Sequence, residues 1–131
     1  MDINEKAELI KSYFRALNRQ DYSMIVSLFH PEAIVHSPLY GKKIASDFFR
    51  ELFDDSNISH VHLEDIFMSC QQKQTAAAHF HYSWTLKNGE NVAFYGVDVF
   101  EFDPKHNLIM QLTIIYDTYY ARIAFGKLNK Y

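Results

Sequence analysis

The fold of this chain is decided by a stretch that reads Thr75-Ala-Ala-Ala-His-Phe-His-Tyr-Ser-Trp-Thr-Leu86, then Lys87-Asn-Gly-Glu90, then Asn91-Val-Ala-Phe-Tyr-Gly-Val-Asp-Val-Phe-Glu-Phe102. Asn-Gly between two runs of β-forming residues predicts a two-residue type I′ turn, because that turn needs positive φ at both central positions. Pairing Lys87 with Glu90 then places His79 opposite Asp98, and His81 opposite Gly96. Cross-strand partners point to the same face with Cβ atoms about 4.5–5.5 Å apart. The stretch therefore predicts a His79–Asp98 pair on one face of a β-hairpin.

Asp98 is the residue in this hairpin that most needs an explanation. Aspartate is disfavoured in strands, and a carboxylate among the apolar residues Val97, Val99 and Phe100 is costly unless it is partnered, exposed or neutral. An imidazole beside a carboxylate is a common proton-transfer pair. We therefore expect His79 and Asp98 to be catalytic, with a purely structural hydrogen bond between them as the alternative.

The composition limits the class of protein. The chain has 131 residues, of which 48% are hydrophobic and 16% aromatic, and its net charge is −3. This length predicts one domain over residues 1–131, and the aromatic content suits a pocket for an apolar ligand or an interface. The charge balance, with no basic cluster, argues against nucleic acid and anionic membranes as partners. Cys70 is the single cysteine, and no segment resembles a membrane span or signal peptide, so we expect a cytoplasmic protein.

The periodicity of apolar residues predicts an α+β domain. Three amphipathic helices are expected, one starting at the Asp2 cap and running to Leu17, one over Tyr22–Phe29 and one over Ile44–Phe53. Strands are expected at 33–37, 58–68, 72–86, 91–103 and 108–120. The order α-α-β-α-β-β-β-β indicates a bent, mainly antiparallel sheet with helices on one side. Such a sheet closes into a cone with an apolar pocket inside.

A metal site is not expected from the histidine positions. His79 and His81 lie two residues apart on one strand face, but zinc sites usually need a third or fourth protein ligand. The other five histidines have no matching spacing; they are His30, His36, His60, His62 and His106. Ser83 continues the polar face of the His79 strand and favours a pocket or a wet sheet surface over a dry core.

Two further parts of the sequence carry a family resemblance. They read Tyr13-Phe-Arg-Ala-Leu-Asn-Arg-Gln-Asp21 with Leu28-Phe-His-Pro-Glu-Ala-Ile-Val-His-Ser-Pro38 and Gly41, and Val97-Asp-Val-Phe-Glu-Phe102 with Leu108-Ile-Met-Gln-Leu112. These motifs resemble the opening and the end of nuclear transport factor 2-like domains, in particular the ketosteroid isomerase and SnoaL-like polyketide cyclase branches. The resemblance implies the cone-shaped fold over nearly the whole chain. It specifies activity poorly, because this scaffold hosts many unrelated functions.

The resemblance also implies roles for individual residues. Tyr13 matches the isomerase tyrosine that donates a hydrogen bond to the substrate oxyanion, and Asp98 matches the protonated aspartic acid that donates beside it. The position of the isomerase base is Ser37, which cannot act as a base at neutral pH. His79 could replace that base if Asp98 is ionised and orients the imidazole. A protonated donor and an ionised orienter are incompatible roles for Asp98, and the neighbouring imidazole favours the ionised form.

The expected pocket lining follows from these assignments. Besides Tyr13, His79 and Asp98, the residues expected to contact substrate are Ser37, Phe49, Phe53, His81, Ser83 and Phe94. In the last strand the resemblance directs Gln111, Thr113 and Ile115 inward, with Asp117. If the last strand has the opposite orientation, the residues that point into the pocket are Met110, Leu112, Ile114 and Tyr116.

Two functions are consistent with these expectations. The first is a SnoaL-like enzyme that transfers protons on a small, largely apolar carbonyl compound by general acid–base catalysis, without metal or organic cofactor. The alternative is a non-catalytic module that binds a hydrophobic small molecule or serves dimerisation. The fold family commonly forms homodimers through the outer sheet face, where Tyr82, Trp84, Tyr95, Val97 and Val99 are expected to lie.

Overall fold

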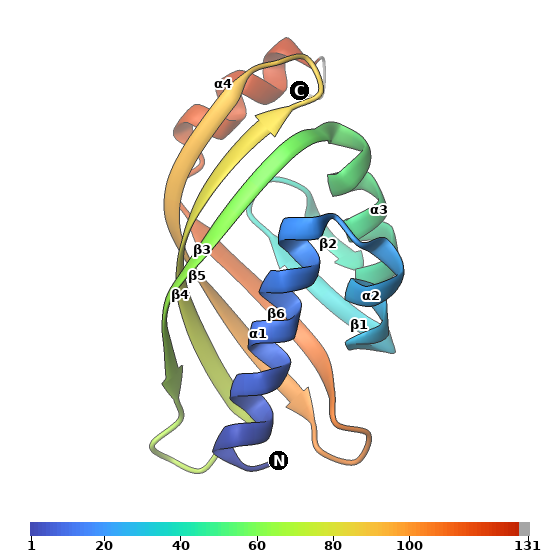
Figure 1. Cartoon of the computed structure of the whole chain (residues 1–131), viewed down its shortest axis with the longest axis vertical. Helices are drawn as coiled ribbons and strands as arrows, with labels where there is room; N and C mark the ends of the chain where they lie inside the picture. Colours follow the sequence, from blue (N-terminus) through green and yellow to red (C-terminus); the bar gives the residue numbers. More distant parts are fainter. Residues whose placement is uncertain (129–131) are drawn as a thin grey trace.

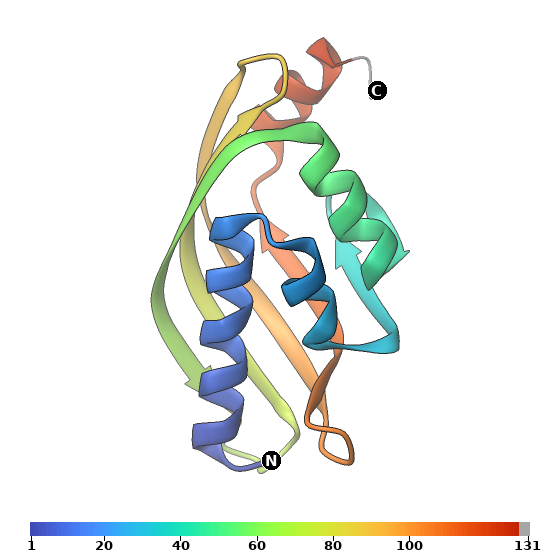
Figure 2. The same cartoon turned by 45° about the vertical axis from the view of Figure 1, so that its right-hand side comes forward.

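The computed structural model describes residues 1–128 and forms a bent six-stranded sheet with helices on its inner face (Figures 1 and 2). The elements, in chain order, are α1 (Ile3–Arg19), α2 (Tyr22–Ser27), β1 (Phe29–Ser37), β2 (Gly41–Ile44), α3 (Ala45–Asp55), β3 (Ser56–Met68), β4 (Thr75–Leu86), β5 (Asn91–Asp103), β6 (Leu108–Tyr116) and α4 (Tyr119–Lys127). The strand order is β2-β1-β6-β5-β4-β3. β1 and β6 are parallel and every other pair is antiparallel. The expected α+β cone with helices on one side is therefore confirmed.

The expected helices form for the reasons given by the sequence. Asp2 caps α1 by accepting a hydrogen bond from the Glu5 amide at 2.8 Å, and Glu5 accepts one from the Asp2 amide at 3.0 Å. The second helix ends at Ser27, before the expected Phe29, and β1 begins at Phe29. Two elements were not expected from the sequence. They are the four-residue strand β2 and the helix α4, which replaces the end of the expected strand 108–120.

The register of the β4–β5 hairpin differs by one residue from the expected one. The Leu86 amide donates to the Glu90 carbonyl at 2.8 Å and the Gly89 amide to the Leu86 carbonyl at 2.9 Å. Gly89 has φ +89°, so the connection is a three-residue loop closed by a glycine in the left-handed region. Ala78 therefore pairs with Asp98, and His79 with Val97. The expected His79–Asp98 pairing is wrong, because the loop contains one residue more than a type I′ turn.

This shift reverses the two faces of β4 relative to expectation. Alternate residues of β4 from Ala76 to Leu86 are buried against the helices. Tyr82 and Trp84 were expected on the outer face, but they are 6% and 2% exposed and face inward. His79 and His81 lie on the outer face instead, because successive side chains of a strand alternate between faces. Among residues 1–128, no helix is long and apolar enough to cross a membrane.

Candidate functional site

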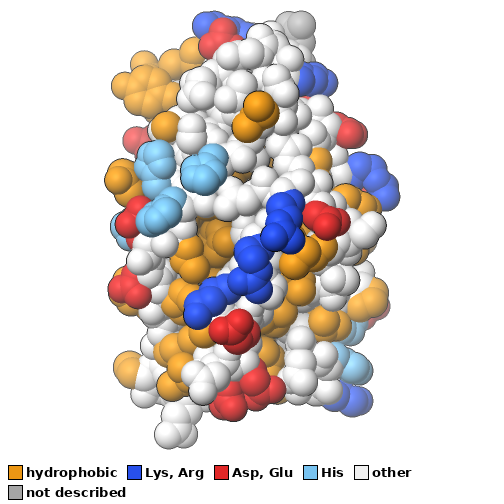
Figure 3. Space-filling model, in the orientation of Figure 1, with side chains coloured by type: hydrophobic (Ala, Val, Ile, Leu, Met, Phe, Trp, Pro, Cys, Tyr) orange, Lys and Arg blue, Asp and Glu red, His pale blue; other side chains and the backbone are white. Residues whose placement is uncertain are grey.

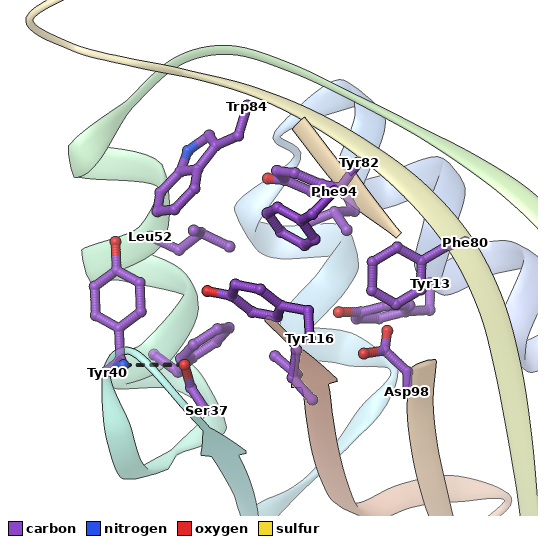
Figure 4. Close-up of a pocket in the computed structure, with 13 residues that line it drawn as sticks. Tyr13, Ser37, Tyr40, Leu52, Phe80, Tyr82, Trp84, Phe94, Asp98 and Tyr116 are labelled. Carbon is purple, nitrogen blue, oxygen red and sulfur yellow. Dashed lines mark hydrogen bonds between the residues drawn. The ribbon is translucent and has the colours of Figure 1, made fainter. Parts of the chain in front are cut away.

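A pocket lies between the inner face of the sheet and helices α1 and α3 (Figure 4). The cavity has a volume of about 50 Å³, several times the roughly 10–15 Å³ that one water molecule requires. Its lining is mostly aromatic and aliphatic, with few polar groups. The lining residues are Tyr13, Leu17, Ser37, Tyr40, Phe48, Leu52, Phe80, Tyr82, Trp84, Phe94, Asp98, Ile114 and Tyr116.

Asp98 is the carboxyl group of this pocket. It projects inward from the middle of β5 and is 2% exposed. Its Oδ1 atom is buried without a hydrogen-bond partner among the described residues. Burial disfavours the charged form and raises the pKa of Asp98 well above its ordinary value of 3.8. The pocket therefore holds a carboxyl group that stays protonated at pH values where surface aspartates are ionised.

Tyr13 brings a hydroxyl group from α1 to the same part of the pocket. Its ring packs edge-on against Phe100 and Phe49, with centroids 5.4 and 6.0 Å away, and its hydroxyl points toward Asp98 (Figure 4). Burial, then Asp98, then Tyr82 raise the pKa of Tyr13 well above 10.0. Tyr13 therefore keeps its proton and can act as a hydrogen-bond donor.

Tyr82 supplies a second buried hydroxyl group, which points away from Asp98 (Figure 4). Burial raises its pKa to about 12, with Ser59 acting to lower it and Asp98 to raise it. The Tyr82 hydroxyl has no hydrogen-bond partner within the described residues, so the contact with Ser59 falls short of hydrogen-bond geometry. Two protonated phenols and one buried carboxyl are thus among the few polar groups of an otherwise apolar cavity.

A second polar group lies at the other end of the pocket. The Tyr40 hydroxyl donates to Asp55 Oδ2 at 2.8 Å, and Asp55 is 2% exposed. Burial and Asp55 together raise the pKa of Tyr40 far above its ordinary value. Lys87 Nζ lies 3.7 Å from Asp55 Oδ1. Because Asp55 has both a hydrogen-bond donor and a nearby cation, it anchors Tyr40 in the pocket wall.

Ser37 lines the pocket as expected, but its hydroxyl oxygen is occupied by the turn after β1. It accepts hydrogen bonds from the backbone amides of Leu39 at 3.1 Å and Tyr40 at 3.0 Å (Figure 4). These contacts shape the β1–β2 turn that positions Tyr40. Ser37 therefore contributes mainly to the form of the pocket wall.

A stack of aromatic rings forms another wall. The Phe94 and Tyr116 ring centroids are 4.0 Å apart, with an angle of 10° between the ring planes. The Phe94 and Tyr82 ring centroids are 5.5 Å apart, with an angle of 18° between the planes. At the α4 end, Phe125 packs on Trp84 and Tyr40, with ring centroids 5.4 and 5.2 Å away. The pocket thus offers flat apolar surfaces to a ligand.

The structure brings together only part of the expected site. Tyr13, Ser37, Phe94 and Asp98 line the pocket. Phe49 is fully buried behind Tyr13, and Phe53 packs on Phe49 with ring centroids 6.1 Å apart; neither is a lining residue.

The histidines expected in the site lie outside it. His79 stacks on Tyr95 with ring centroids 5.6 Å apart, and His81 lies 4.7 Å from the same ring. Ser83 is paired with Ala93 on this outer face. With His79 on the opposite side of the sheet from Asp98, the argument for an imidazole base oriented by an ionised Asp98 no longer holds.

The last strand takes the second of the two expected orientations. Leu112, Ile114 and Tyr116 face inward, and the latter two line the pocket. Gln111, Thr113 and Ile115 face outward, with the Gln111 amide oxygen 3.0 Å from His36 Nε2. The pairing of β5 with β6 shifts register between Glu101 and Phe102 of β5, so the alternation of faces seen in this part of β6 does not continue to the start of the strand. The resemblance-based choice for β6 was therefore wrong.

The expected lining did not include the aromatic residues Tyr40, Phe80, Tyr82 and Trp84, and it included Tyr116 only in the alternative orientation of the last strand. For β4 a signal was present, because Phe80, Tyr82 and Trp84 alternate with the more polar His79, His81 and Ser83. That alternation indicates which face is buried.

Comparisons with known proteins agree with this geometry. A family model described as "SnoaL-like domain" matches residues 10–110. A putative SnoaL-like polyketide cyclase from Shewanella denitrificans OS-217 has a similar structure, with TM-score 0.73, 16% identity, and coverage of 98% of this chain and 99% of that one.

Two further solved structures share the fold. One is AclR, a putative hydroxylase from Streptomyces galilaeus, with TM-score 0.75, 14% identity, and coverage of 96% of this chain and 83% of that one. The other is the epoxide hydrolase/cyclase-like enzyme SalBIII of salinomycin pyran-ring formation, with TM-score 0.75, 20% identity, and coverage of 88% and 93%. A sequence comparison with curated proteins gives no match. The family-model match spans most of the chain, which therefore belongs to the SnoaL-like domain family.

Proposed function

We propose that this protein is a small-molecule enzyme that transfers protons on a small, largely apolar carbonyl compound, with Asp98 as its acid–base group. The observation that carries the proposal is the Asp98 carboxyl, which is buried in an apolar pocket with an unpaired Oδ1 atom and has the Tyr13 hydroxyl pointing toward it (Figure 4). An unpaired buried carboxyl costs stability. Such a cost is typical of groups retained for function.

The proposed reaction uses only residues of this chain. The ionised form of Asp98 removes a proton from the carbon next to the substrate carbonyl. The negative charge then moves to the carbonyl oxygen, which accepts a hydrogen bond from the Tyr13 hydroxyl. The protonated Asp98 returns the proton to another atom of the substrate, which completes an isomerisation. In a cyclisation the enolate carbon first bonds to a second carbonyl carbon of the same substrate, and the oxygen of that carbonyl takes the proton. No step requires a metal or organic cofactor.

The raised pKa of Asp98 suits this role. A carboxylate with an ordinary pKa of 3.8 is a weak base, whereas a base whose pKa lies nearer the working pH takes protons more effectively. The pH dependence of this reaction therefore has a defined sign. Activity should rise with pH as Asp98 loses its proton, with a midpoint well above the ordinary aspartate value.

The proposal is tested with ligands found by thermal-shift screening of apolar carbonyl compounds. Each ligand is incubated with the protein in deuterated water, and exchange of its carbon-bound hydrogens is followed by NMR. Asp98→Asn should reduce the exchange rate on the order of 10²–10⁴-fold, which is typical of losing a general acid–base group. Asp65→Asn is the matched control, because Asp65 is exposed on β3, and it should exchange at the wild-type rate.

Two outcomes would contradict this function. Equal exchange rates for the wild type and Asp98→Asn would remove Asp98 from the reaction. Ligands that bind tightly but show no exchange with the wild type at any pH would favour the non-catalytic ligand-binding module.

We also propose that the protein forms a homodimer through the outer sheet face. This face lacks Tyr82 and Trp84, which were expected on it but face inward. Tyr95 and Ile115 are 63% and 53% exposed there, and Val97 and Val99 are half-buried between them. Exposed apolar residues on one sheet face favour burial against a second copy.

Cys70 is a free, exposed thiol, which supports a reducing, cytoplasmic location.

A further inference from the structure

Three potential metal ligands meet at the edge of the sheet, away from the pocket. His30 belongs to β1, Asp103 is the last residue of β5, and His106 lies in the turn between β5 and β6. One ligand atom from each residue lies within 4.8 Å of the other two. None of the three lines the pocket. Figure 3 shows histidine side chains on the lower right edge of the molecule, where Figure 1 places the start of β1 and the β5–β6 turn.

The backbone holds the two contributing segments together. The Ile109 amide donates to the Leu28 carbonyl at 2.9 Å, and Phe29 pairs with Ile109. The turn itself is braced by the Lys105 amide, which donates to Asp103 Oδ1 at 3.0 Å. His30 and His106 therefore face each other because the fold brings their backbones together, and their ring centroids lie 5.9 Å apart.

The side chains are partly organised for coordination. His106 Nδ1 lies 2.7 Å from Asp103 Oδ2, so the two groups already lie side by side, and binding one ion exchanges this hydrogen bond for metal bonds. An aspartate carboxylate is charged at neutral pH, so Asp103 supplies the negative charge of the set. Two imidazoles and a carboxylate are ligands that Zn²⁺ and similar transition-metal ions accept.

His30 must adjust when a metal binds. Its Nδ1 accepts a hydrogen bond from the Glu32 amide at 3.0 Å, which places the proton of the neutral ring on Nε2. Coordination through Nε2 requires that proton to move, and coordination through Nδ1 requires the Glu32 bond to break. In either case one hydrogen bond is exchanged for one metal bond, and we expect micromolar rather than tighter affinity.

We propose that His30, Asp103 and His106 form a binding site for a zinc-like divalent transition-metal ion, with water in the remaining coordination position. The ion would connect the start of β1 to the β5–β6 turn and so clip the edge of the sheet. This site is independent of the pocket chemistry, so each proposal can fail without the other.

The test is a calorimetric titration of tag-free, chelator-treated protein with Zn²⁺. The wild type should bind one ion, and a hundredfold excess over Kd should raise Tm on the order of 5–10 °C. His106→Ala, His30→Ala and Asp103→Asn should each weaken binding about 10–100-fold. His106→Gln also removes the imidazole but keeps a longer side chain than His106→Ala, so it separates loss of the ligand from disturbance of the turn. It should weaken binding like His106→Ala.

The matched control is His62→Ala. His62 is exposed and pairs with His81 across β3 and β4, which makes these two residues the main competing pair of imidazoles. This variant should bind Zn²⁺ like the wild type. The proposal is overturned if the wild type does not bind, if His62→Ala abolishes binding, or if any of the three ligand substitutions leaves the affinity unchanged in a folded protein.

Discussion

Asp98 lowers the stability of the fold, and the same burial that does so gives the pocket a carboxyl group with a raised pKa. Its Oδ1 atom is buried without a hydrogen-bond partner among residues 1–128, and burial raises its pKa. The mostly apolar lining of the pocket around it favours the neutral carboxyl. The same surroundings that make Asp98 unfavourable for stability make its proton available for chemistry.

This cost predicts how stability depends on pH. A folded-state pKa above the unfolded value means that the unfolded chain releases the Asp98 proton first as pH rises. Below the unfolded pKa both states are protonated, and between the two pKa values the free energy of unfolding falls by about 1.4 kcal/mol per pH unit. Asp98→Asn removes this dependence. The variant should therefore gain stability over the wild type as pH rises from 4 to 8.

Urea unfolding of both proteins at the two pH values measures this gain. Asp65→Asn, at an exposed position on β3, controls for the general effect of removing a carboxylate. A difference between wild type and Asp98→Asn that is the same at both pH values would show that Asp98 is not held neutral by the fold.

Within the sheet, Gly96 lets β5 pass close to its neighbours. A Cβ atom at this position would lie 2.6 Å from the Phe80 ring and 3.0 Å from the Ile115 carbonyl oxygen. The ring can shift only within a packed core, and the carbonyl belongs to the paired strand β6. We expect Gly96→Ala to destabilise the protein by about 1–3 kcal/mol through overpacking.

Gly126→Ala is the matched control for this substitution. Gly126 lies in α4 with no atom within 4 Å of the added Cβ, so alanine should be neutral or stabilising by up to about 1 kcal/mol. Denaturant unfolding of both variants gives the comparison. Equal stabilities for Gly96→Ala and the wild type would mean that the β4–β5–β6 packing is looser than described.

The same elements show how far the sequence predicts this fold. The periodicity of α1 and α3 identifies both helices, and Asn88-Gly89 identifies the hairpin. The dipeptide fits both a two-residue and a three-residue loop, however, and one residue changes the face of every side chain in β4. Tyr13 and Asp98 could be assigned to the site because α1 and β5 were oriented correctly. Tyr40 and Phe125 could not, because they depend on a tertiary turn and on an unexpected helix.

The spatial meeting of His30 with Asp103 and His106 was also beyond sequence reasoning. More than seventy residues separate the two parts of the chain. They meet because β1 joins the sheet in parallel beside β6. No local pattern specifies that pairing, which is set by the packing of the whole sheet.

At the scale of the whole molecule, the sheet separates an inner face that lines the pocket from an outer face suited to association. The outer face carries Tyr95 and Ile115 as its most exposed apolar side chains. Placing a charge at its centre should prevent a second copy from docking, because the lysine would be buried without a partner. We therefore expect the wild type to sediment as a dimer and Ile115→Lys as a monomer.

Sedimentation at micromolar concentrations, with circular dichroism to confirm folding, provides the measurement. Ile123→Lys is a suitable control, because Ile123 is 48% exposed on α4 rather than on the sheet. A wild type that remains monomeric, or a dimer that persists in Ile115→Lys, would exclude the outer face as the interface.

The central claim, that the fold holds Asp98 as a protonated carboxyl in the pocket, can be measured directly without a substrate. Carboxyl-carbon NMR of protein labelled at aspartate gives a titration curve for each group, and the Asp98→Asn spectrum identifies the Asp98 signal. We predict that the Asp98 carboxyl stays protonated through the range in which surface aspartates ionise and titrates well above 3.8. A curve with a midpoint near that ordinary value would contradict the account.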